Sequence, residues 1–237
     1  MPSHSPDVNF ESYRAQLARF ARQLGRLGYA PGSAGNLSVR LRAGEVLATP
    51  TGCRKCDLRP ADMVVVDEDG EFLHGTRNVT SEIGMHLAVY RARPDVFAVV
   101  HAHPPIATGF ACSGIALDKP LCSEVLMCIG PVPLAAYATT GTDEVAASLK
   151  HLVVDHDAIL LANHGVVTFG TSVEEAFLRM ETVEHSAHIA LVARQLGGGI
   201  PLTSEQIEAL RHARMRYSAL SASTPGKRLK SGVTVTQ

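Results

Sequence analysis

Residues 99–105, VVHAHPP, end an apolar run in two histidines and a proline pair. The apolar residues predict a buried β-strand, and the prolines force the backbone to turn directly after it. In an extended strand residues i and i+2 point to the same side, so His101 and His103 can direct two imidazoles at one point. This stretch therefore predicts half of a metal site at the end of a strand.

A second apolar run, residues 158–162 (AILLA), also ends in a polar corner, Asn163-His164-Gly165. His164 is the natural third ligand beside the histidine pair. Three neutral imidazoles leave coordination positions open for substrate or water, which is typical of a catalytic rather than a structural metal site. The alternative is that these histidines stand at strand ends by chance, in a chain that has 11 of them.

Two other groups of metal-ligating residue types are less convincing. Cys53 and Cys56 have the spacing of half a zinc knuckle, but no second cysteine pair or nearby histidine pair completes it. His185 and His188 lie three residues apart on a predicted helix, one turn after Glu181, and a solvated polar face explains them better. The five cysteines are an odd number without a paired framework, which favours reduced thiols.

Length and charge narrow the class of protein. The 237 residues suit one α/β domain with a substantial core. The chain has 22 Lys and Arg against 23 Asp and Glu, so its net charge of −1 argues against a nucleic-acid or membrane partner. No apolar run approaches the roughly 18 residues that span a bilayer, and the first residues lack a signal-peptide pattern. We therefore expect a cytoplasmic protein.

The hydrophobic periodicity predicts an α/β chain without repeats or an internal linker. Residues 1–217 are expected to form a single domain, and residues 218–237, which have little to bury, a mobile tail. The expected helices are 10–27, 83–91, 106–112, 142–154, 172–196 and 203–214, and the expected strands are 37–41, 46–48, 63–66, 71–73, 97–100, 126–129, 132–134, 158–162 and 166–169.

Three short segments offer groups that bind anions. Residues 32–38 (GSAGNLS) and 49–52 (TPTG) form turns whose backbone N–H groups and small polar side chains can cradle a phosphate. Thr80 and Ser81 stand at the start of a predicted helix, where free N–H groups and the dipole attract anions. The alternatives are two ordinary tight turns and, for Glu82, an acid that merely favours the first turn of a helix.

Six motifs in this order resemble the class II aldolases of the fuculose-phosphate aldolase and adducin-head family. The resemblance runs from about residue 10 to residue 196. Each motif alone is weak, but the ordered set is specific. The motifs are GNLS (35–38), TG (51–52), TSE (80–82), HAHP (101–104), YATTGT (137–142) and NHG (163–165).

The resemblance implies a three-layer α/β/α fold around a mixed central sheet, assembled as a homotetramer with active sites at subunit interfaces. It implies that His101, His103 and His164 bind the metal, which is expected to be Zn²⁺, with Mn²⁺, Co²⁺ and Fe²⁺ as alternatives. Glu82 corresponds to the catalytic acid/base and can also reach the metal in the resting enzyme. The residues implied to hold the substrate phosphate are Asn36, Thr51, Gly52, Thr80 and Ser81.

The activity implied is that of a lyase that cleaves a ketose 1-phosphate, such as fuculose 1-phosphate, into dihydroxyacetone phosphate and an aldehyde through an enediolate. One departure concerns the proton donor to the aldehyde oxygen. Family members carry a tyrosine where this chain reads Cys122-Ser123-Glu124-Val125. Tyr217 stands at a place comparable to that of a second, C-terminal tyrosine and is the remaining candidate.

Other members of the superfamily share the three-histidine site. The main alternative is a decarboxylase of a 3-oxo sugar-acid phosphate, which the segment 32–40 also resembles. Sister decarboxylases read Ser-Lys-Glu where this chain has Thr80-Ser81-Glu82, and epimerases read Ser-Ser-Asp, so the triplet favours an aldolase. A dehydratase and an enzyme of non-phosphorylated substrates are further alternatives. An adducin-like binding module is disfavoured because all four expected site residues are present.

Overall fold

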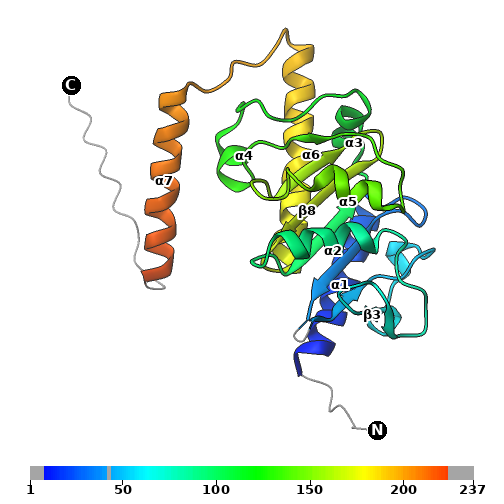
Figure 1. Ribbon diagram of the computed structural model, residues 1–237. Coiled ribbons are helices and arrows are strands. Elements are labelled where there is room, and N and C mark those ends of the chain that lie inside the picture. Colours follow the sequence, from blue (N-terminus) through cyan, green and yellow to red (C-terminus); the bar gives the residue numbers. More distant parts are fainter. Residues whose placement is uncertain (1–7, 42–43, 224–237) are drawn as a thin grey trace, which may run out of the picture.

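The computed structural model describes residues 8–41 and 44–223 and contains one eight-stranded mixed sheet (Figure 1). The strand order is β4-β3-β2-β1-β5-β8-β7-β6, and every pair is antiparallel except β6 with β7. The strands are β1 (Asn36–Arg40), β2 (Val46–Ala48), β3 (Val64–Val66), β4 (Phe72–His74), β5 (Ala98–Ala102), β6 (Leu134–Ala135), β7 (Ala158–Leu161) and β8 (Gly165–Gly170).

Seven α-helices lie in the described residues: α1 (Val8–Arg26), α2 (Ile83–Ala92), α3 (Pro105–Cys112), α4 (Ser123–Cys128), α5 (Asp143–Leu149), α6 (Val173–Gln195) and α7 (Ser204–Ser223). Two 3-10 helices, η2 (Lys55–Asp57) and η3 (Pro60–Asp62), follow β2 and pack against α1. Among the described helices, none is both long and apolar enough to cross a membrane. All five cysteines are free thiols.

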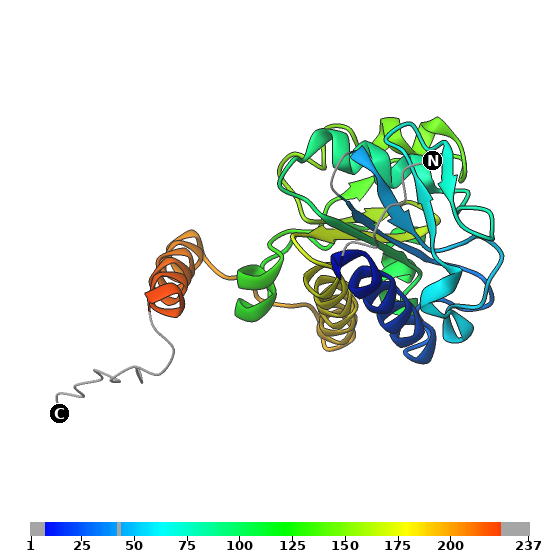
Figure 2. The ribbon, with the colours of Figure 1, turned by 90° about the horizontal axis from the view of Figure 1, so that it is seen from below.

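Alternating side chains of the central strands supply two hydrophobic cores, one on each face of the sheet. On β5, Val100 belongs to the core under α1, α3 and α6, whereas Val99 belongs to the core under α2 and α5. On β8, Val166 and Val167 divide in the same way. Figure 2 shows α1 and α6 side by side on one face of the sheet, away from α2 and α5. The expected three-layer α/β/α fold around a mixed sheet is therefore confirmed.

One expected strand is wrong. Residues 126–129 belong to the end of α4 and its cap, because Leu126 N–H donates to Cys122 O at 3.1 Å and Ile129 N–H to Val125 O at 2.9 Å. A four-residue apolar run does not distinguish a strand from a helix. Here the edge position beside β7 is taken by β6, so the run has no strand to pair with.

The C-terminal helix is longer than expected. α7 runs to Ser223, past the predicted end at Arg214, so residues 218–223 of the expected tail are helical. No proline or glycine interrupts the chain between residue 204 and Pro225, so nothing stops the helix earlier. The rest of the expected tail, residues 224–237, lies outside the described residues, and the single-domain assignment stays a prediction.

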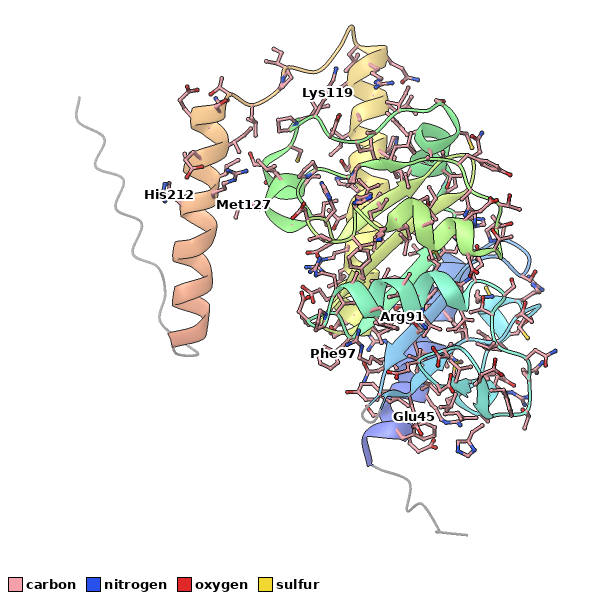
Figure 3. The ribbon with its side chains drawn as sticks, viewed as in Figure 1. Glu45, Arg91, Phe97, Lys119, Met127 and His212 are labelled. Carbon is pink, nitrogen blue, oxygen red and sulfur yellow. The ribbon has the colours of Figure 1, made fainter. Side chains whose placement is uncertain are left out.

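α7 stands apart from the sheet and its covering helices in both ribbon views (Figures 1 and 2). It begins with the predicted capping pattern: Gln206 N–H donates to Thr203 Oγ1 at 3.3 Å, and Thr203 N–H donates to Gln206 Oε1 at 2.8 Å. Its contacts with the remainder of the chain are made mainly to α4, and Figure 3 shows Met127 of α4 on the side that faces it.

Candidate active site

The first two histidines lie where β5 gives way to α3. His101 is inside β5 and His103 is just beyond it, so both point to the face of α2 as the two-residue period requires. Three hydrogen bonds fix this strand end. His103 N–H donates to Tyr29 O at 2.7 Å, and Glu184 accepts the first N–H groups of α3, from Ile106 at 3.0 Å and Ala107 at 2.8 Å. The proline turn is thereby held against α6.

The third histidine comes from the tight corner between β7 and β8. Asn163 adopts φ 55°, a left-handed conformation that asparagine tolerates better than most residues. Because β8 pairs antiparallel with β5, with Val167 opposite His101, the corner brings His164 beside the histidine pair. One ligand atom of each of His101, His103 and His164 lies within 4.8 Å of the others. The structure therefore brings together the three histidines that the sequence predicted as ligands.

Gly165, directly after His164, is required by the packing of this corner. A Cβ atom here would lie 2.6 Å from both Ala102 O and His103 Cδ2. We expect Gly165→Ala to push the His103 ring away and to destabilise the fold by about 1–3 kcal/mol, the usual cost of overpacking. Metal affinity should fall together with the unfolding free energy. Gly84→Ala is the matched control, since its Cβ would meet no atom within 4 Å. Equal metal binding by the Gly165 variant and wild type would contradict this account.

The donor set fits a divalent cation. His101 Nδ1 lies 2.9 Å from Val166 O, so it carries the proton and leaves the Nε2 lone pair facing the site. His103 Nε2 lies 3.1 Å from that atom. Burial lowers the pKa of His101 to about 3, and it also lowers the pKa of His103, so both rings are neutral at pH 7 as metal binding requires.

Glu82 faces the histidines from the start of α2. Its Oε1 lies 3.1 Å from His164 Nε2, and its Oε2 lies 3.4 Å from His101 Nε2. Oε2 also accepts from Asn36 Nδ2 at 2.8 Å, whereas buried Oε1 has no hydrogen-bond donor among the described residues. Burial raises the pKa of Glu82, but the facing imidazoles of His101 and His164 and the Asn36 donor outweigh it, so the net pKa lies below its usual value. A buried carboxylate that faces two of three convergent imidazoles, with one oxygen lacking a donor, makes a site that a cation would fill.

The expected anion-binding segments lie next to one another. Thr49 joins two of them, since its N–H donates to Leu37 O at 2.9 Å and its hydroxyl accepts from Leu37 N–H at 3.1 Å. Thr51 N–H donates to Asn78 O at 3.0 Å, and Pro50 pairs with Val79, which places the 49–52 turn beside Thr80 and Ser81. A pocket opens next to this helix start, lined by Ser81, Glu82, Thr142 and Asp143 among others.

Lys55 is a component that the sequence reasoning missed. Its side chain is 1% exposed, and Nζ donates to Ser33 O and Cys53 O, each at 2.9 Å. The ammonium therefore joins the 32–38 segment to the residue that follows Gly52. Burial lowers the pKa of Lys55, and the charges of Cys53 and Glu82 oppose that effect. A lysine within a short polar turn carries no sequence signal that distinguishes it from a solvent-exposed one.

Other candidate residues lie elsewhere. His185 and His188 are exposed on α6, in agreement with a solvated face. The segment that lacks the family tyrosine forms the start of α4. Tyr217 belongs to α7, and its side chain lies outside the described part of the structure.

Comparison with known proteins places this arrangement in a family. Residues 15–191 match the family model described as Class II Aldolase and Adducin N-terminal domain. The chain is 40% identical over 186 residues to a 3-oxo-tetronate 4-phosphate decarboxylase of Escherichia coli O6:H1, covering 77% of this chain and 87% of that protein. It is 33% identical over 199 residues to a 5-deoxy-D-ribulose 1-phosphate aldolase of Bacillus thuringiensis serovar kurstaki, covering 83% of this chain and 92% of that protein.

Among solved structures, an L-fuculose 1-phosphate aldolase superposes with a TM-score of 0.82 at 30% identity, covering 92% of this chain and 100% of that one. The matched region contains every strand of the sheet, the three histidines and Glu82. The chain therefore belongs to the class II aldolase and adducin family.

Proposed function

We propose that this protein is a metal-dependent aldolase that cleaves a ketose 1-phosphate, such as fuculose 1-phosphate, into dihydroxyacetone phosphate and an aldehyde. The observation that carries the proposal is the arrangement of a carboxylate 3.1–3.4 Å from two of three convergent imidazoles. Relatives named as aldolases of phosphorylated sugars support the substrate class. The set of imidazoles with one carboxylate suits Zn²⁺ best, with Mn²⁺, Co²⁺ and Fe²⁺ as alternatives.

The residues divide the chemistry between them. His101, His103 and His164 would hold the metal, which when bound supplies positive charge where negative charge develops on the substrate carbonyl. Glu82 would transfer the proton at the carbon next to the carbonyl. In the synthetic direction its carboxylate removes this proton, and in cleavage its carboxyl group returns it. The lowered pKa of Glu82 keeps its carboxylate ionised at neutral pH, which is the form that can accept a proton.

The three adjacent loops would hold the phosphate. Thr51, Gly52, Thr80 and Ser81 offer hydroxyl and backbone N–H donors, and Asn36 has a second N–H beyond the one it donates to Glu82. These donors are neutral. Lys55 adds a positive charge behind the loops. This charge would attract the phosphate oxygens strongly, because the buried lysine is shielded by little solvent.

We expect Lys55→Met to raise KM for a phosphorylated substrate by about tenfold or more, because a positive charge near the phosphate is lost from a region with little solvent, and to change kcat much less. Inhibition by inorganic phosphate should weaken in parallel. Lys119→Met is the matched control, because Lys119 is an exposed lysine near the last turn of α6 (Figure 3). Unchanged KM and phosphate inhibition in the Lys55 variant would remove this lysine from substrate binding.

A second function, decarboxylation of a 3-oxo sugar-acid phosphate, is favoured by the 40% identity to a named decarboxylase. Such a substrate carries a carboxylate as well as a phosphate, which calls for a further cation. Residue 81 is a serine here, where sister decarboxylases are expected to carry lysine. For this reason we rank the aldolase first.

A substrate screen tests both functions. Purified protein supplied with Zn²⁺ is incubated with several ketose 1-phosphates and with 3-oxo sugar-acid phosphates, and dihydroxyacetone phosphate and carbon dioxide are measured. Chelator-sensitive release of the triose phosphate is the expected result. Release of carbon dioxide without triose phosphate would assign the protein to the decarboxylases. No product from either class of substrate would exclude both proposals.

We propose further that the protein is a cytoplasmic homotetramer with active sites at subunit interfaces. The position of α7, held to the rest of the chain mainly by α4, supports an assembly in which a second subunit covers it. Light scattering on the purified protein measures the mass directly, and a monomer would exclude this arrangement.

A further inference from the structure

We propose that Tyr90, Ser38 and His86 are positioning residues that act through Asn36 to hold the Glu82 carboxylate, in a buried hydrogen-bond chain with one fixed donor direction. The inference rests on the proposed function, in which Glu82 is the catalytic acid/base, and it deepens that function. In the described part of the chain, none of these three side chains hydrogen-bonds to His101, His103 or His164. Ser38 ends the GNLS motif, whereas no sequence motif pointed to His86 or Tyr90.

The chain consists of four consecutive hydrogen bonds. Tyr90 Oη lies 2.7 Å from Ser38 Oγ, which lies 2.7 Å from His86 Nδ1. His86 Nε2 lies 2.6 Å from Asn36 Oδ1, and Asn36 Nδ2 lies 2.8 Å from Glu82 Oε2. Ser38 and His86 are fully buried, and Asn36 and Tyr90 are 3% and 6% exposed. Water therefore does not compete for these bonds.

The chain combines the four-residue spacing of a helix with the two-residue spacing of a strand. Glu82, the N-cap of α2, is followed at intervals of four by His86 and Tyr90, so all three lie along one side of that helix. Asn36 and Ser38 are two apart on β1 and therefore share one face of the strand. The side of α2 that carries Glu82, His86 and Tyr90 faces this face of β1. Successive members of the hydrogen-bond chain therefore come alternately from α2 and from β1.

The direction of every bond follows from the carboxylate. An ionised carboxylate only accepts, so Asn36 must present its amide nitrogen to Glu82 and its oxygen to His86. His86 then donates from Nε2 and accepts at Nδ1. Ser38 must donate to that nitrogen, so its oxygen accepts the Tyr90 hydroxyl. Burial lowers the pKa of His86 to about 4 although the charge of Glu82 opposes it, which agrees with a neutral ring having one donor and one acceptor nitrogen.

The function of such a chain is orientation and not proton transfer. An amide does not readily pass a proton on, so Asn36 separates His86 from the carboxylate as an acid or base. What the chain delivers to Glu82 is one well-aimed N–H donor. That donor fixes Oε2, leaves Oε1 free to face the reacting carbon, and keeps the carboxylate from shifting fully onto the histidines.

The test compares two substitutions at one position. His86→Gln keeps a donor where Nε2 stands, whereas His86→Met fills similar volume without one. We expect His86→Met to lower kcat about 10- to 100-fold, the usual cost of losing such a supporting contact, with KM and metal content close to wild type. His86→Gln should recover most of that loss. Equal kcat in the two variants, or a loss confined to KM, would overturn the proposal.

Two distal variants keep the test open if the residue 86 variants fold poorly. Ser38→Ala and Tyr90→Phe break the chain further from Glu82, so both should lower kcat, and Tyr90→Phe should lower it less. Thr168→Val is the matched control: Thr168 is fully buried and donates to Ala176 O at 2.7 Å, outside the chain. It should lose stability while kcat is retained. Wild-type kcat in both distal variants would overturn the proposal.

A readout without turnover separates this inference from the proposed function. Nitrogen–proton correlation spectra of wild-type protein identify which ring nitrogen of His86 carries the proton. We expect the Nε2–H form, and the Nδ1–H form would overturn the chain whatever the enzyme does. If the Nε2–H form is found and no sugar phosphate is turned over, the proposed function fails and the chain stands.

Discussion

The Glu82→Gln variant is expected to retain its metal and its fold and to lose about a hundred- to ten-thousandfold in kcat, the range that a general acid/base contributes. Glutamine has the shape of glutamate, and its oxygen can still accept the Asn36 N–H bond at the Oε2 position. It cannot take up or return a proton. The measurements are kcat, KM and metal content of the purified variant.

The control for this variant is Glu174→Gln, which changes an exposed carboxylate at the start of α6 by the same atom. It should behave as wild type. A Glu82 variant with full kcat would remove Glu82 from the mechanism. A variant that loses metal along with activity would instead make Glu82 chiefly a ligand, because Oε1 and Oε2 lie near His164 and His101.

The second large effect is expected on metal binding. His164→Ala removes one of three imidazoles, and because His164 belongs to neither hydrophobic core, little core packing is disturbed. Two remaining imidazoles bind a divalent ion poorly, so metal content should fall far below one ion per chain and turnover should fall to background. The variant also leaves Glu82 with one fewer facing imidazole.

Thermal unfolding gives a readout that does not depend on activity. A ligand that binds only the folded state stabilises it, by about 2.7 kcal/mol at one hundred times its Kd. Added Zn²⁺ should therefore raise the Tm of wild type and of His185→Ala, in which an exposed α6 histidine is replaced. It should leave the Tm of His164→Ala unchanged. An equal Tm increase in all three proteins would place the metal elsewhere.

The strand-end histidines were predictable because their signal is local. A two-residue period and a proline turn determine that His101 and His103 point the same way. The position of His164 beside them could not be predicted from local sequence alone. It follows from the antiparallel register of β5 with β8. The failed strand at 126–129 shows the opposite case, in which a short apolar run takes its structure from the neighbours available to it.

The anion-binding segments were predictable as turns but not as one site. Their residue types follow from local backbone chemistry, whereas their adjacency depends on long-range pairing such as that of Pro50 with Val79. Lys55 illustrates the limit. Its charge is visible in the sequence, but its burial and its contacts with Ser33 and Cys53 arise only when η2 packs under the loops.

By itself the sequence determined the α/β class, most of the helices and strands, the three histidines and Glu82 as candidate site residues, and the family resemblance, because these depend on periodicity and on ordered motifs. Only the tertiary structure decided that Asn36 donates a hydrogen bond to Glu82 and that His86, Ser38 and Tyr90 continue the hydrogen-bond chain from Asn36. The physical reason is that those side chains are ordinary in their own elements. They become a directed chain only because α2 lies across β1 where solvent cannot supply the same hydrogen bonds.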